Sequence, residues 1–504
     1  MSSFRFVGNT LVDSAELAKA VSGFVGRPLS FTELQQAAAA VANAYREAGW
    51  IVRAYLPRQD VSGGVVSIQI VEAIFGGTRI EGEKPSRESV QRIEDMVARR
   101  QKVGEPLNAD AVDRALLLAS DLPAVTVAGS LEAGTKAGET NLALKFADKP
   151  MFMGDGAVDN TGSRSTGRNR FAGNLYVNSP FQAGELFTAN YIRTWGSDRF
   201  APPGSNYIRF AAGLPVGLDG LRVGVNGSYM GYRLISSEYE ALDAKGSSTT
   251  VGLEASYPII RSRMRNLFVN ANIDHKVFDN RVLDATTSNY TSDSLTLTLS
   301  GNLFDKLGGG GANSASLAFT TGRLNLDGSP NEAADAATTR TAGAYSKLRF
   351  SISRQQAITP ELSAYFSYAG QLASKNLDSS EKFYLGGAYG VRAYPTNEGG
   401  GSQAHLVNFE LRQRLPEGFT LVGFVDYGRV QVNQDNSFAG AAAPNRYDLK
   451  GGGLSVVWQS DVGAMVKATW AHRFGVNPNR TTAGYDQDGT LIKDRFWISA
   501  NMSF

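Results

Sequence analysis

The stretch of sequence that decides the fold is the last one, Phe496-Trp-Ile-Ser-Ala-Asn-Met-Ser-Phe504. Successive side chains of a strand point to opposite faces, and here one face is apolar while the other is mostly polar. This alternation fits a wall with lipid outside and water inside, whereas a soluble sandwich needs strands of only about 5–6 residues. The ending therefore predicts a membrane-spanning β-barrel. The apolar face would carry Phe496, Ile498, Ala500, Met502 and Phe504.

The composition narrows the class of protein further. No apolar run reaches the roughly 20 residues that a membrane helix needs, which excludes spanning by helices. A barrel escapes such a search because only every second residue of its strands faces lipid. The formal net charge of +2 gives no sign of a nucleic-acid partner, and the absence of cysteine excludes disulfides and thiolate chemistry.

The beginning of the chain carries no secretory leader. Met1-Ser-Ser-Phe-Arg-Phe6 leads directly into a first strand, and a barrel does not reach an outer membrane without such a leader. We therefore expect the sequence to be a mature or trimmed form.

Residues 1–149 have a different sequence pattern from the barrel region, with helical periodicity and few strand signals. They divide into two similar halves, 1–73 and 74–149. In the first half, Ser30-Phe-Thr-Glu33 is a capping box that begins a helix, and Gly49 is the expected stop. Each half is predicted to hold a strand, two helices and two further strands, at 4–7, 14–24, 34–48, 51–56 and 65–71, and again at 77–82, 86–100, 108–121, 125–131 and 140–146.

A β-α-α-β-β unit of about 75 residues is large enough to bury a small core on one side of a three-stranded sheet. The sheet edge then stays available. Because exposed edges are liabilities, proteins keep them where a partner strand is meant to add. The alternative is that the two units are inert spacers.

Tight turns indicate the size of the barrel that fills residues 150–504. Periplasmic turns of bacterial barrels are short and the outer loops are long. Seven tight turns link eight hairpins and predict sixteen antiparallel strands, at about 22 residues per strand and connector where roughly 10 must span. The turns lie at 179–184, 217–220, 260–265, 305–312, 355–360, 415–418 and 459–462.

One outer loop, residues 375–404, stands apart by length and composition. It contains Tyr384-Leu-Gly-Gly-Ala-Tyr-Gly-Val-Arg-Ala-Tyr-Pro395, with glycines that permit tight folding and a lone arginine, Arg392. An arginine forced into a confined space needs a carboxylate partner. In the next hairpin, Phe424-Val-Asp-Tyr-Gly428 places Phe424, Asp426 and Gly428 on one strand face, so that Asp426 points into the lumen if the other face meets lipid. The alternative is a surface arginine and an ordinary lumenal aspartate.

These segments carry a resemblance to a known family. Ala44-Tyr-Arg-Glu-Ala-Gly-Trp50, Leu56-Pro-Arg-Gln59 and Ile68-Gln-Ile-Val-Glu72 resemble the first POTRA domain of two-partner secretion transporters, the TpsB class or haemolysin/haemagglutinin secretion-activation family. Val391-Arg392-Ala393-Tyr394 is similar to the Val-Arg-Gly-Tyr signature of the sixth loop in the POTRA-plus-barrel superfamily, and the segment 424–428 matches its Phe-x-Asp-x-Gly partner. Ala393 departs from the usual glycine, so its φ must avoid strongly positive values.

The resemblance implies a function and a site. The protein would be an outer-membrane transporter that exports one large β-helical exoprotein from periplasm to cell surface, with periplasmic POTRA domains that capture the unfolded cargo. In that family the sixth loop folds into the pore, so Arg392 would pair with Asp426, beside Phe424 and Gly428. Phe504 would end the C-terminal signal read by the barrel assembly machinery. The family usually has a plug helix before the first POTRA domain, and this sequence begins too late to contain it.

The sequence gives little support for a metal site or for catalytic chemistry. The three histidines, His275, His405 and His472, lack metal-ligand spacing, and no Gly-x-Ser-x-Gly elbow occurs. We expect a monomer in contact with membrane lipid that is not an enzyme and has no cofactor, metal or nucleic-acid partner. Two rival functions stay open. An insertase that assembles other barrels shares the loop motif but tends to have more than two POTRA domains, and a passive porin leaves residues 1–149 unexplained.

Overall fold

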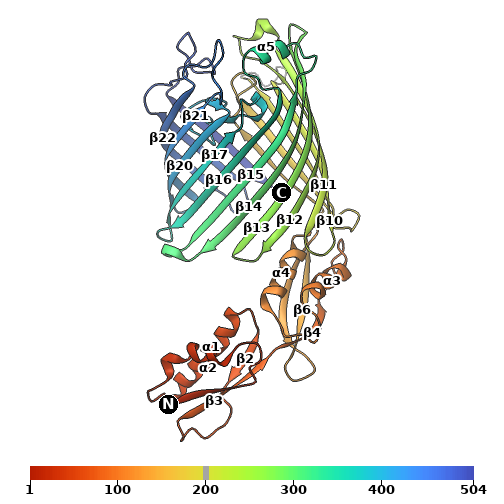
Figure 1. Ribbon diagram of the computed structural model, residues 1–504, viewed down its shortest axis with the longest axis vertical. Helices are drawn as coiled ribbons and strands as arrows, with labels where there is room; N and C mark the ends of the chain where they lie inside the picture. The colour runs from red at the N-terminus through yellow and green to blue at the C-terminus, as the bar shows by residue number, and fades with distance from the viewer. Residues whose placement is uncertain (197–203) are drawn as a thin grey trace.

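The structure is a computed structural model that describes residues 1–196 and 204–504. It has three parts arranged along its long axis: a large barrel, a small α/β unit directly below it, and a second small unit at the far end, which holds the N-terminus (Figure 1). The chain runs from the distal unit to the barrel.

The distal unit packs its helices on one side of a three-stranded sheet. The sheet order is β1-β3-β2, with β1 parallel and β2 antiparallel to the central strand. Leu17, Val41, Tyr45 and Ile68 are fully buried between helices and sheet. Ser30 and Glu33 form both halves of the capping box. The elements are β1 (Ser3–Val7), α1 (Ser14–Ala20), the 3-10 turn η1 (Ser22–Phe24), α2 (Phe31–Glu47), β2 (Val52–Tyr55) and β3 (Val65–Glu72).

The second unit repeats this arrangement with sheet order β4-β6-β5. Its core is a separate cluster that includes Phe75, Ile93, Leu116 and Leu144. The first helix begins at Val90 and not at Ser86, because the Ser89 side chain accepts the Arg92 backbone N–H and caps it there. The elements are β4 (Ile74–Glu81), α3 (Val90–Arg100), α4 (Ala109–Ser120), β5 (Val125–Ala133) and β6 (Glu139–Asp148).

The barrel confirms the predicted architecture. Within the described residues, sixteen antiparallel strands close on themselves through the pairing of the first, β7, with the last, β24. Every turn predicted from the sequence joins a pair of neighbouring strands. The strands are β7 (Phe152–Asp159), β8 (Asn169–Asn178), β9 (Leu186–Trp195), β10 (Ser205–Val216), β11 (Leu221–Arg233), β12 (Lys245–Arg261), β13 (Arg265–Val282), β14 (Ala285–Asp305), β15 (Gly311–Asn325), β16 (Gly343–Ala357), β17 (Leu362–Ala373), β20 (Gln403–Arg414), β21 (Phe419–Gln431), β22 (Arg446–Gln459), β23 (Met465–Arg473) and β24 (Asp494–Ser503).

The two faces of the barrel wall differ as its alternation predicts. Apolar side chains such as Phe210, Leu253 and Ile273 project outward and are more than half exposed, which is the surface that lipid covers. Polar side chains pair inside, as Thr296 does with Thr320 at 2.9 Å between their hydroxyl oxygens. Among the helices of residues 1–196 and 204–504, none is both long and apolar enough to cross a membrane.

The height of the wall varies around the barrel. The strands β12, β13, β14 and β15 are 15 to 21 residues long, whereas β7, β8, β23 and β24 have only 8 to 10. The hairpin of β13 and β14 turns over at Leu283 and Asp284, which have positive φ of 49° and 63°. Long loops complete the rim elsewhere, together with the short helix α5 (Glu332–Ala337) (Figure 1).

Polar contacts join the three parts. Between the two small units, the Ala109 N–H donates to the Gly49 carbonyl at 2.8 Å, and the Ile51 N–H donates to the Leu107 carbonyl at 3.2 Å. Between the second unit and the barrel, Arg263 pairs with Asp113 at 2.9 Å; further pairs join Arg261 to Asp121 at 2.8 Å and Arg100 to Asp219 at 2.6 Å. The second small unit is thus joined to short turns at the lower end of the barrel (Figure 1).

Candidate functional site

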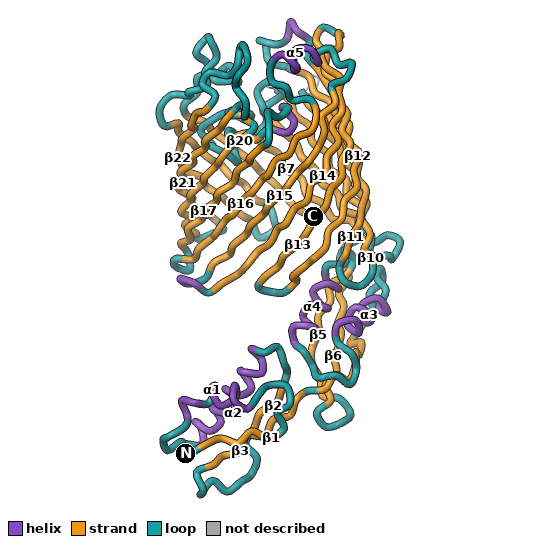
Figure 2. Tube along the Cα trace, viewed as in Figure 1, coloured by secondary structure: helices purple, strands orange, loops and turns teal. Residues whose placement is uncertain are grey.

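The loop between β17 and β20, residues 374–402, folds into the upper half of the barrel (Figure 2). We call it the inner loop. Counting outer loops from β7 makes it the sixth. β20 begins at Gln403, so Ala404, expected in the loop, belongs to a strand instead. Short elements stiffen the loop: the 3-10 turn η4 (Ser379–Glu381) and the two-residue strands β18 (Phe383–Tyr384) and β19 (Gly400–Gly401).

Arg392 of the inner loop contacts Asp426 on β21 in a fork arrangement. Its Nε donates to Asp426 Oδ2 at 2.9 Å, its Nη2 donates to Oδ1 at 2.7 Å, and its backbone N–H donates to Oδ2 at 3.0 Å. The two residues are 4% and 2% exposed. Two parallel N–H···O bonds fix orientation as well as distance, so this contact sets the position of the loop on the wall.

Three further groups complete the surroundings of Arg392. Its Nη1 donates to Glu410 Oε1 at 2.7 Å. The guanidinium carbon lies 3.5 Å from the centroid of the Phe424 ring, a cation–π stack. The Trp497 indole N–H, from the last strand, donates to the Arg392 carbonyl at 2.8 Å. One residue of the loop is thereby held by β20, β21 and β24.

Glu410 and Trp497 were not identified from the sequence. Both lie on the lumen face of their strands, and Glu410 stands opposite Phe424 in the register of β20 and β21. Strand alternation alone places them inside the barrel. Only the register between strands, which the local sequence does not reveal, brings them to Arg392.

Small residues let the loop approach the wall closely. A Cβ added at Gly428 would lie 2.9 Å from side-chain carbons of Leu385 and Val391. Ala393 is fully buried against Gly451, where an added Cβ would lie 2.5 Å from that of Ala393. Ala393 does not adopt a positive φ, so the backbone accommodates alanine here. Tyr394 is buried in the same apolar cluster, and Arg473 lies 4.4 Å over its ring.

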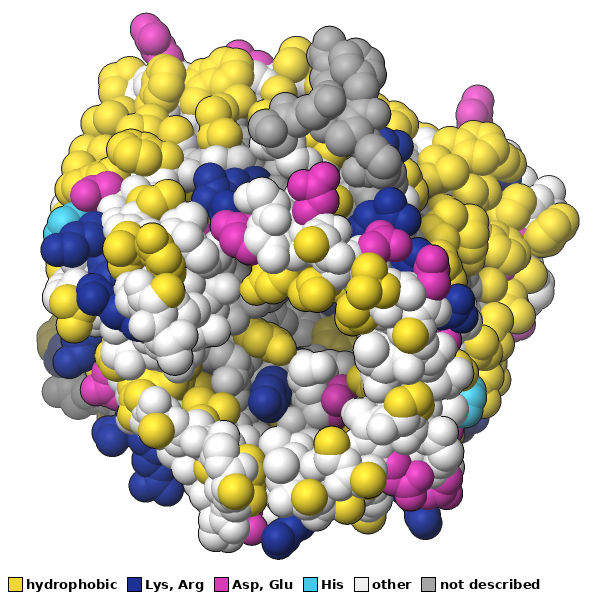
Figure 3. Space-filling view, turned by 90° about the horizontal axis from the view of Figure 1, so that it is seen from above, with side chains coloured by type: hydrophobic (Ala, Val, Ile, Leu, Met, Phe, Trp, Pro, Cys, Tyr) yellow, Lys and Arg dark blue, Asp and Glu magenta, His cyan; other side chains and the backbone are white. Residues whose placement is uncertain are grey.

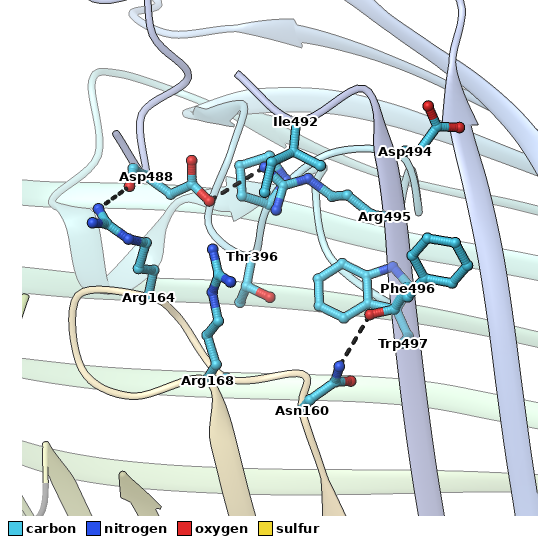
Figure 4. Close-up of a pocket in the computed structure, with 12 residues that line it drawn as sticks. Asn160, Arg164, Arg168, Thr396, Asp488, Ile492, Asp494, Arg495, Phe496 and Trp497 are labelled. Atoms are coloured by element: carbon cyan, nitrogen blue, oxygen red, sulfur yellow. Dashed lines mark hydrogen bonds and ion pairs between the residues drawn. The ribbon is translucent and has the colours of Figure 1, made fainter. Parts of the chain in front are cut away.

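A pocket of about 230 Å³ lies beside the loop, at the seam of the barrel (Figure 4). Asn160 donates its side-chain N–H to the Phe496 carbonyl at 3.0 Å, which extends the pairing of β7 with β24. Arg164 donates to the Asp488 carbonyl at 2.8 Å. Thr396 of the inner loop donates its hydroxyl to the Thr161 carbonyl at 2.8 Å. The loop therefore also contacts the seam.

The end of the chain lies at this seam on the periplasmic side. Phe504 and Gly154 exchange backbone hydrogen bonds of 2.9 and 3.0 Å. The Phe504 side chain is 78% exposed on the outer surface of the barrel. Seen from above, the lumen appears as a hollow among the outer loops, with basic and acidic side chains along it (Figure 3). Within the part of the chain that the structure describes, no group of three or more His, Cys, Asp or Glu is placed to hold a metal ion.

A closed barrel of this kind, with a folded inner loop and two α/β units on its periplasmic side, defines an outer-membrane transport protein with POTRA domains. The family described as haemolysin secretion/activation protein ShlB/FhaC/HecB matches residues 138–447, and the ShlB-type POTRA domain matches residues 1–73. The chain belongs to this family, whose members are two-partner secretion transporters. It is an outer-membrane protein with its POTRA domains in the periplasm.

Named relatives agree with this membership. The heme/hemopexin transporter protein HuxB of Haemophilus influenzae is 25% identical over 513 residues, which cover 98% of this chain and 85% of the relative. The outer membrane transporter CdiB of Dickeya dadantii is 23% identical and covers 93% of this chain and 80% of its own length.

Solved structures share the fold. CdiB from Escherichia coli has a TM-score of 0.73 at 21% identity, with 100% of this chain and 90% of that chain covered. BamA from Haemophilus ducreyi lacking POTRA domains 1–3 has a TM-score of 0.58 at 15% identity and full coverage of both chains.

Proposed function

We propose that this two-partner secretion transporter exports one large β-helical exoprotein, and that its POTRA domains capture the unfolded N-terminal segment of this cargo. The inner loop carries the proposal. Its Arg392 contact with Asp426 and Glu410 is a buried, geometrically specific attachment inside a water-filled pore. A passive porin would also leave the two small units of residues 1–149 without a role.

Sheet edges support capture by the POTRA domains. The outer strands of the two small sheets are β1 and β2 in one and β4 and β5 in the other. In β5, the residues from Ala128 to Ala133 are exposed. An extended segment of cargo adds to such an edge through main-chain hydrogen bonds, which suits a chain that has not yet folded. Folding of the exoprotein outside the cell then biases its movement outward.

Val391, Arg392, Ala393 and Tyr394 act by holding the inner loop in its transport-competent position and perform no chemistry. Asp426, with Phe424 and Gly428, is their receiving surface on the wall. The transporter works as a monomer without cofactor or metal. Phe504 ends the strand that the barrel assembly machinery reads when it inserts the protein.

The decisive experiment measures surface delivery of an exoprotein encoded beside this gene. Cells carry the wild type, Arg392→Ala, or a deletion of residues 1–73, and heat-modifiable mobility reports the amount of folded barrel. We expect export to fail in both variants while the folded barrel persists. Unchanged export, accompanied by depletion of other outer-membrane barrels, would replace this proposal with an insertase function.

A further inference from the structure

The inner loop has a second attachment, on the part of the wall formed by β13, β16 and β17. Glu381, at the end of η4, is 4% exposed. Its Oε1 pairs with the Lys276 ammonium at 2.9 Å, and its Oε2 pairs with the ammonium of Lys347, which is 7% exposed. A carboxylate of the loop is therefore buried between two cations of the wall.

The same part of the wall also binds the backbone of the loop. The Glu381 carbonyl accepts from Lys347 Nζ at 3.2 Å and from Gln371 Nε2 at 3.1 Å. The next carbonyl, that of Lys382, accepts from Arg349 Nη2 at 3.0 Å, and Lys382 is extended with φ −68° and ψ 158°. Arg349 Nε in turn donates to Gln371 Oε1 at 2.5 Å, which orients both donors. We call Lys276, Lys347, Arg349 and Gln371 the wall site.

The wall site has the chemistry of a receptor for an acidic extended peptide. It offers ammonium groups to one carboxylate and neighbouring donors to two successive main-chain carbonyls. Every residue of a polypeptide presents a carbonyl, so this part of the recognition does not depend on sequence. The three wall cations face one loop carboxylate, so the site retains positive charge even when it is filled, and electrostatic complementarity selects an acidic partner.

The two attachments of the loop are opposite in sign. At the first, the loop supplies the cation Arg392 to the wall carboxylates Asp426 and Glu410. At the second, it supplies the anion Glu381 to wall cations. Removing the loop leaves Lys347, the buried cation of the wall site, without its counter-charge, which is unfavourable until water or another anion replaces it. The wall site therefore becomes available to an acidic ligand when the loop moves.

We propose that the wall site is a peptide-binding site of the pore, which takes an acidic extended segment of the exported polypeptide once the inner loop vacates it. Glu381 and Lys382 occupy this site in the resting protein as an internal stand-in for cargo. The inference rests on the proposed function, in which a polypeptide passes through the lumen. Exchange between loop and cargo at one site would couple the arrival of cargo to the release of the loop.

The test uses the full chain in planar lipid bilayers and a synthetic peptide of alternating Glu and Gly as the probe. Matched peptides carry Gln or Lys in place of Glu. In Glu381→Gln, which weakens the hold of the loop, we expect the Glu peptide to block the current at an about tenfold lower concentration than the Gln peptide, as about 1.4 kcal/mol of preference requires. The Lys peptide should not block at that concentration.

Substitutions in the wall site test whether the preference for the Glu peptide arises there. Adding Lys347→Gln or, separately, Lys276→Gln to Glu381→Gln should abolish the advantage of the Glu peptide, whereas Lys306→Gln, at an exposed turn, should preserve it. Two wall variants are used so that poor folding of one leaves the other as a test. Equal block by the Glu and Gln peptides, or a preference that survives both wall changes, would overturn the inference.

The result of this peptide test can be distinguished from the result of the export experiment that tests the proposed function. Block by the peptides is measured on the purified pore and needs no exoprotein. Export of the exoprotein by cells with no peptide preference in bilayers would reject the wall site alone. A peptide preference in a protein that exports nothing would reject the proposed function together with the assignment of the site to cargo.

Discussion

At the scale of single residues, Arg392 shows how a loop is fixed inside a pore. Its guanidinium is buried between two carboxylates and stacked on an aromatic ring. Breaking a buried pair by removing one partner costs about 3–5 kcal/mol, because the other charge is left buried. Here Asp426 would be left buried without its cation, whereas Glu410 would keep Arg412 at 2.7 Å.

Even the conservative change Arg392→Lys should lower surface delivery of the exoprotein severalfold. A lysine cannot donate in parallel to both oxygens of Asp426, and it loses the planar stack on Phe424. Export is compared with the amount of folded barrel in the same cells. Arg446→Lys, on the exposed end of β22, is the matched control and should export normally. Wild-type export by Arg392→Lys would show that charge alone holds the loop.

A second residue-scale prediction concerns Glu72 in the first POTRA domain. Its carboxylate accepts the backbone N–H groups of Thr10 and Leu11 at 2.7 and 2.8 Å, and the Tyr45 hydroxyl at 2.8 Å. Burial raises the pKa of Glu72, but a hydrogen bond from the Thr10 hydroxyl, together with these three, outweighs burial and holds the pKa below its usual value. The carboxylate therefore stabilises the domain at pH values above its unfolded pKa of about 4.3. This contribution is lost as the pH falls through the lower folded pKa.

Glu72→Gln should lower the free energy of unfolding of residues 1–149 at neutral pH by about 1–2 kcal/mol. It should also flatten the fall in stability between about pH 5 and pH 2. Urea unfolding followed by the fluorescence of Trp50, the one tryptophan of this fragment, measures both effects. Glu83→Gln, in the exposed connection between sheet and helix, serves as the control. An unchanged pH dependence in Glu72→Gln would contradict the assignment.

Residue types and their spacing in the sequence were enough to predict part of the site. The glycine-rich loop with a lone arginine, and a strand with an aspartate on its lumen face, pointed to Arg392 and Asp426. Glu410, Trp497 and Glu381 looked like ordinary residues of strands and a loop. What distinguishes them is the stagger between strands and the path of the loop across the lumen, both of which are properties of the closed barrel.

At the scale of elements, β21 supports the inner loop on one face and meets lipid on the other. Gly428 faces the loop, whereas Gly423 faces outward, where an added Cβ would meet Leu454 Cδ2 at an ordinary 3.8 Å. Gly428→Val should displace Leu385 and Val391 and reduce export, while Gly423→Val should leave export unchanged. Folded barrel and surface exoprotein are measured for both. Equal export by the two variants would show that close approach of the loop is dispensable.

The last strand forms the weakest junction of the barrel. Among the described pairs of barrel strands, β24 and β7 share the shortest register, five paired residues, whereas β13 and β14 share eighteen. Phe504 adds one backbone exchange with Gly154 at the end of this register. Deleting Phe504 should therefore lower the fraction of heat-modifiable, folded barrel severalfold, and Phe496→Ala should lower it less. A full amount of folded barrel after the deletion would remove Phe504 from barrel assembly.

Elements were predictable where local chemistry defines them. Turns between strands were identified because glycine, proline and polar clusters interrupt the alternation. The start of α3 was misplaced because Ser86 and Ser89 are both acceptable caps, and only the folded structure selects Ser89. The contacts of the inner loop depend on strands far apart in the sequence and were predicted only through its motif.

At the scale of the whole molecule, the second small unit is joined to the barrel by ion pairs that solvent reaches. Such pairs are worth about 0.2–1 kcal/mol each, so the joint depends on several of them together. Changing Asp113 and Asp121 to lysine should loosen the joint, because each then repels Arg263 or Arg261. Adding Arg263→Glu and Arg261→Glu to this protein restores opposite charges across the joint. The second unit should then again be held in one position relative to the barrel.

Spin labels measure this joint directly. The chain contains no cysteine, so labels attach only to residues changed to cysteine, such as Lys136 in the domain and Lys306 in a barrel turn. The distribution of distances between the labels should broaden in the doubly changed protein and narrow in the charge-swapped one. A distribution that stays narrow throughout would mean that other contacts fix the unit, such as that of Arg114 with the Pro258 carbonyl and of Leu218 with the core of the unit.

The overall plan of two small units and a sixteen-stranded barrel followed from alternation, turns and periodicity. The position of the units below the barrel did not, because it depends on charges paired across more than a hundred residues of sequence, as Arg263 and Asp113 are. Pairings over such separations leave no local pattern.

The uneven height of the barrel wall gives the pore exit one side made of sheet and one side made of loops. A strand of 21 residues such as β14 is about 70 Å long at about 3.4 Å per residue, well beyond the roughly 25 Å apolar band of the membrane even when it is tilted. On that side of the barrel, the hydrogen-bonded sheet continues beyond the membrane into the aqueous phase outside. Across from it, above β24 and β7, the rim consists of loops. A polypeptide that emerges from the pore therefore meets continuous sheet on one side of the exit and folded loops on the other, so the two sides present different surfaces to it.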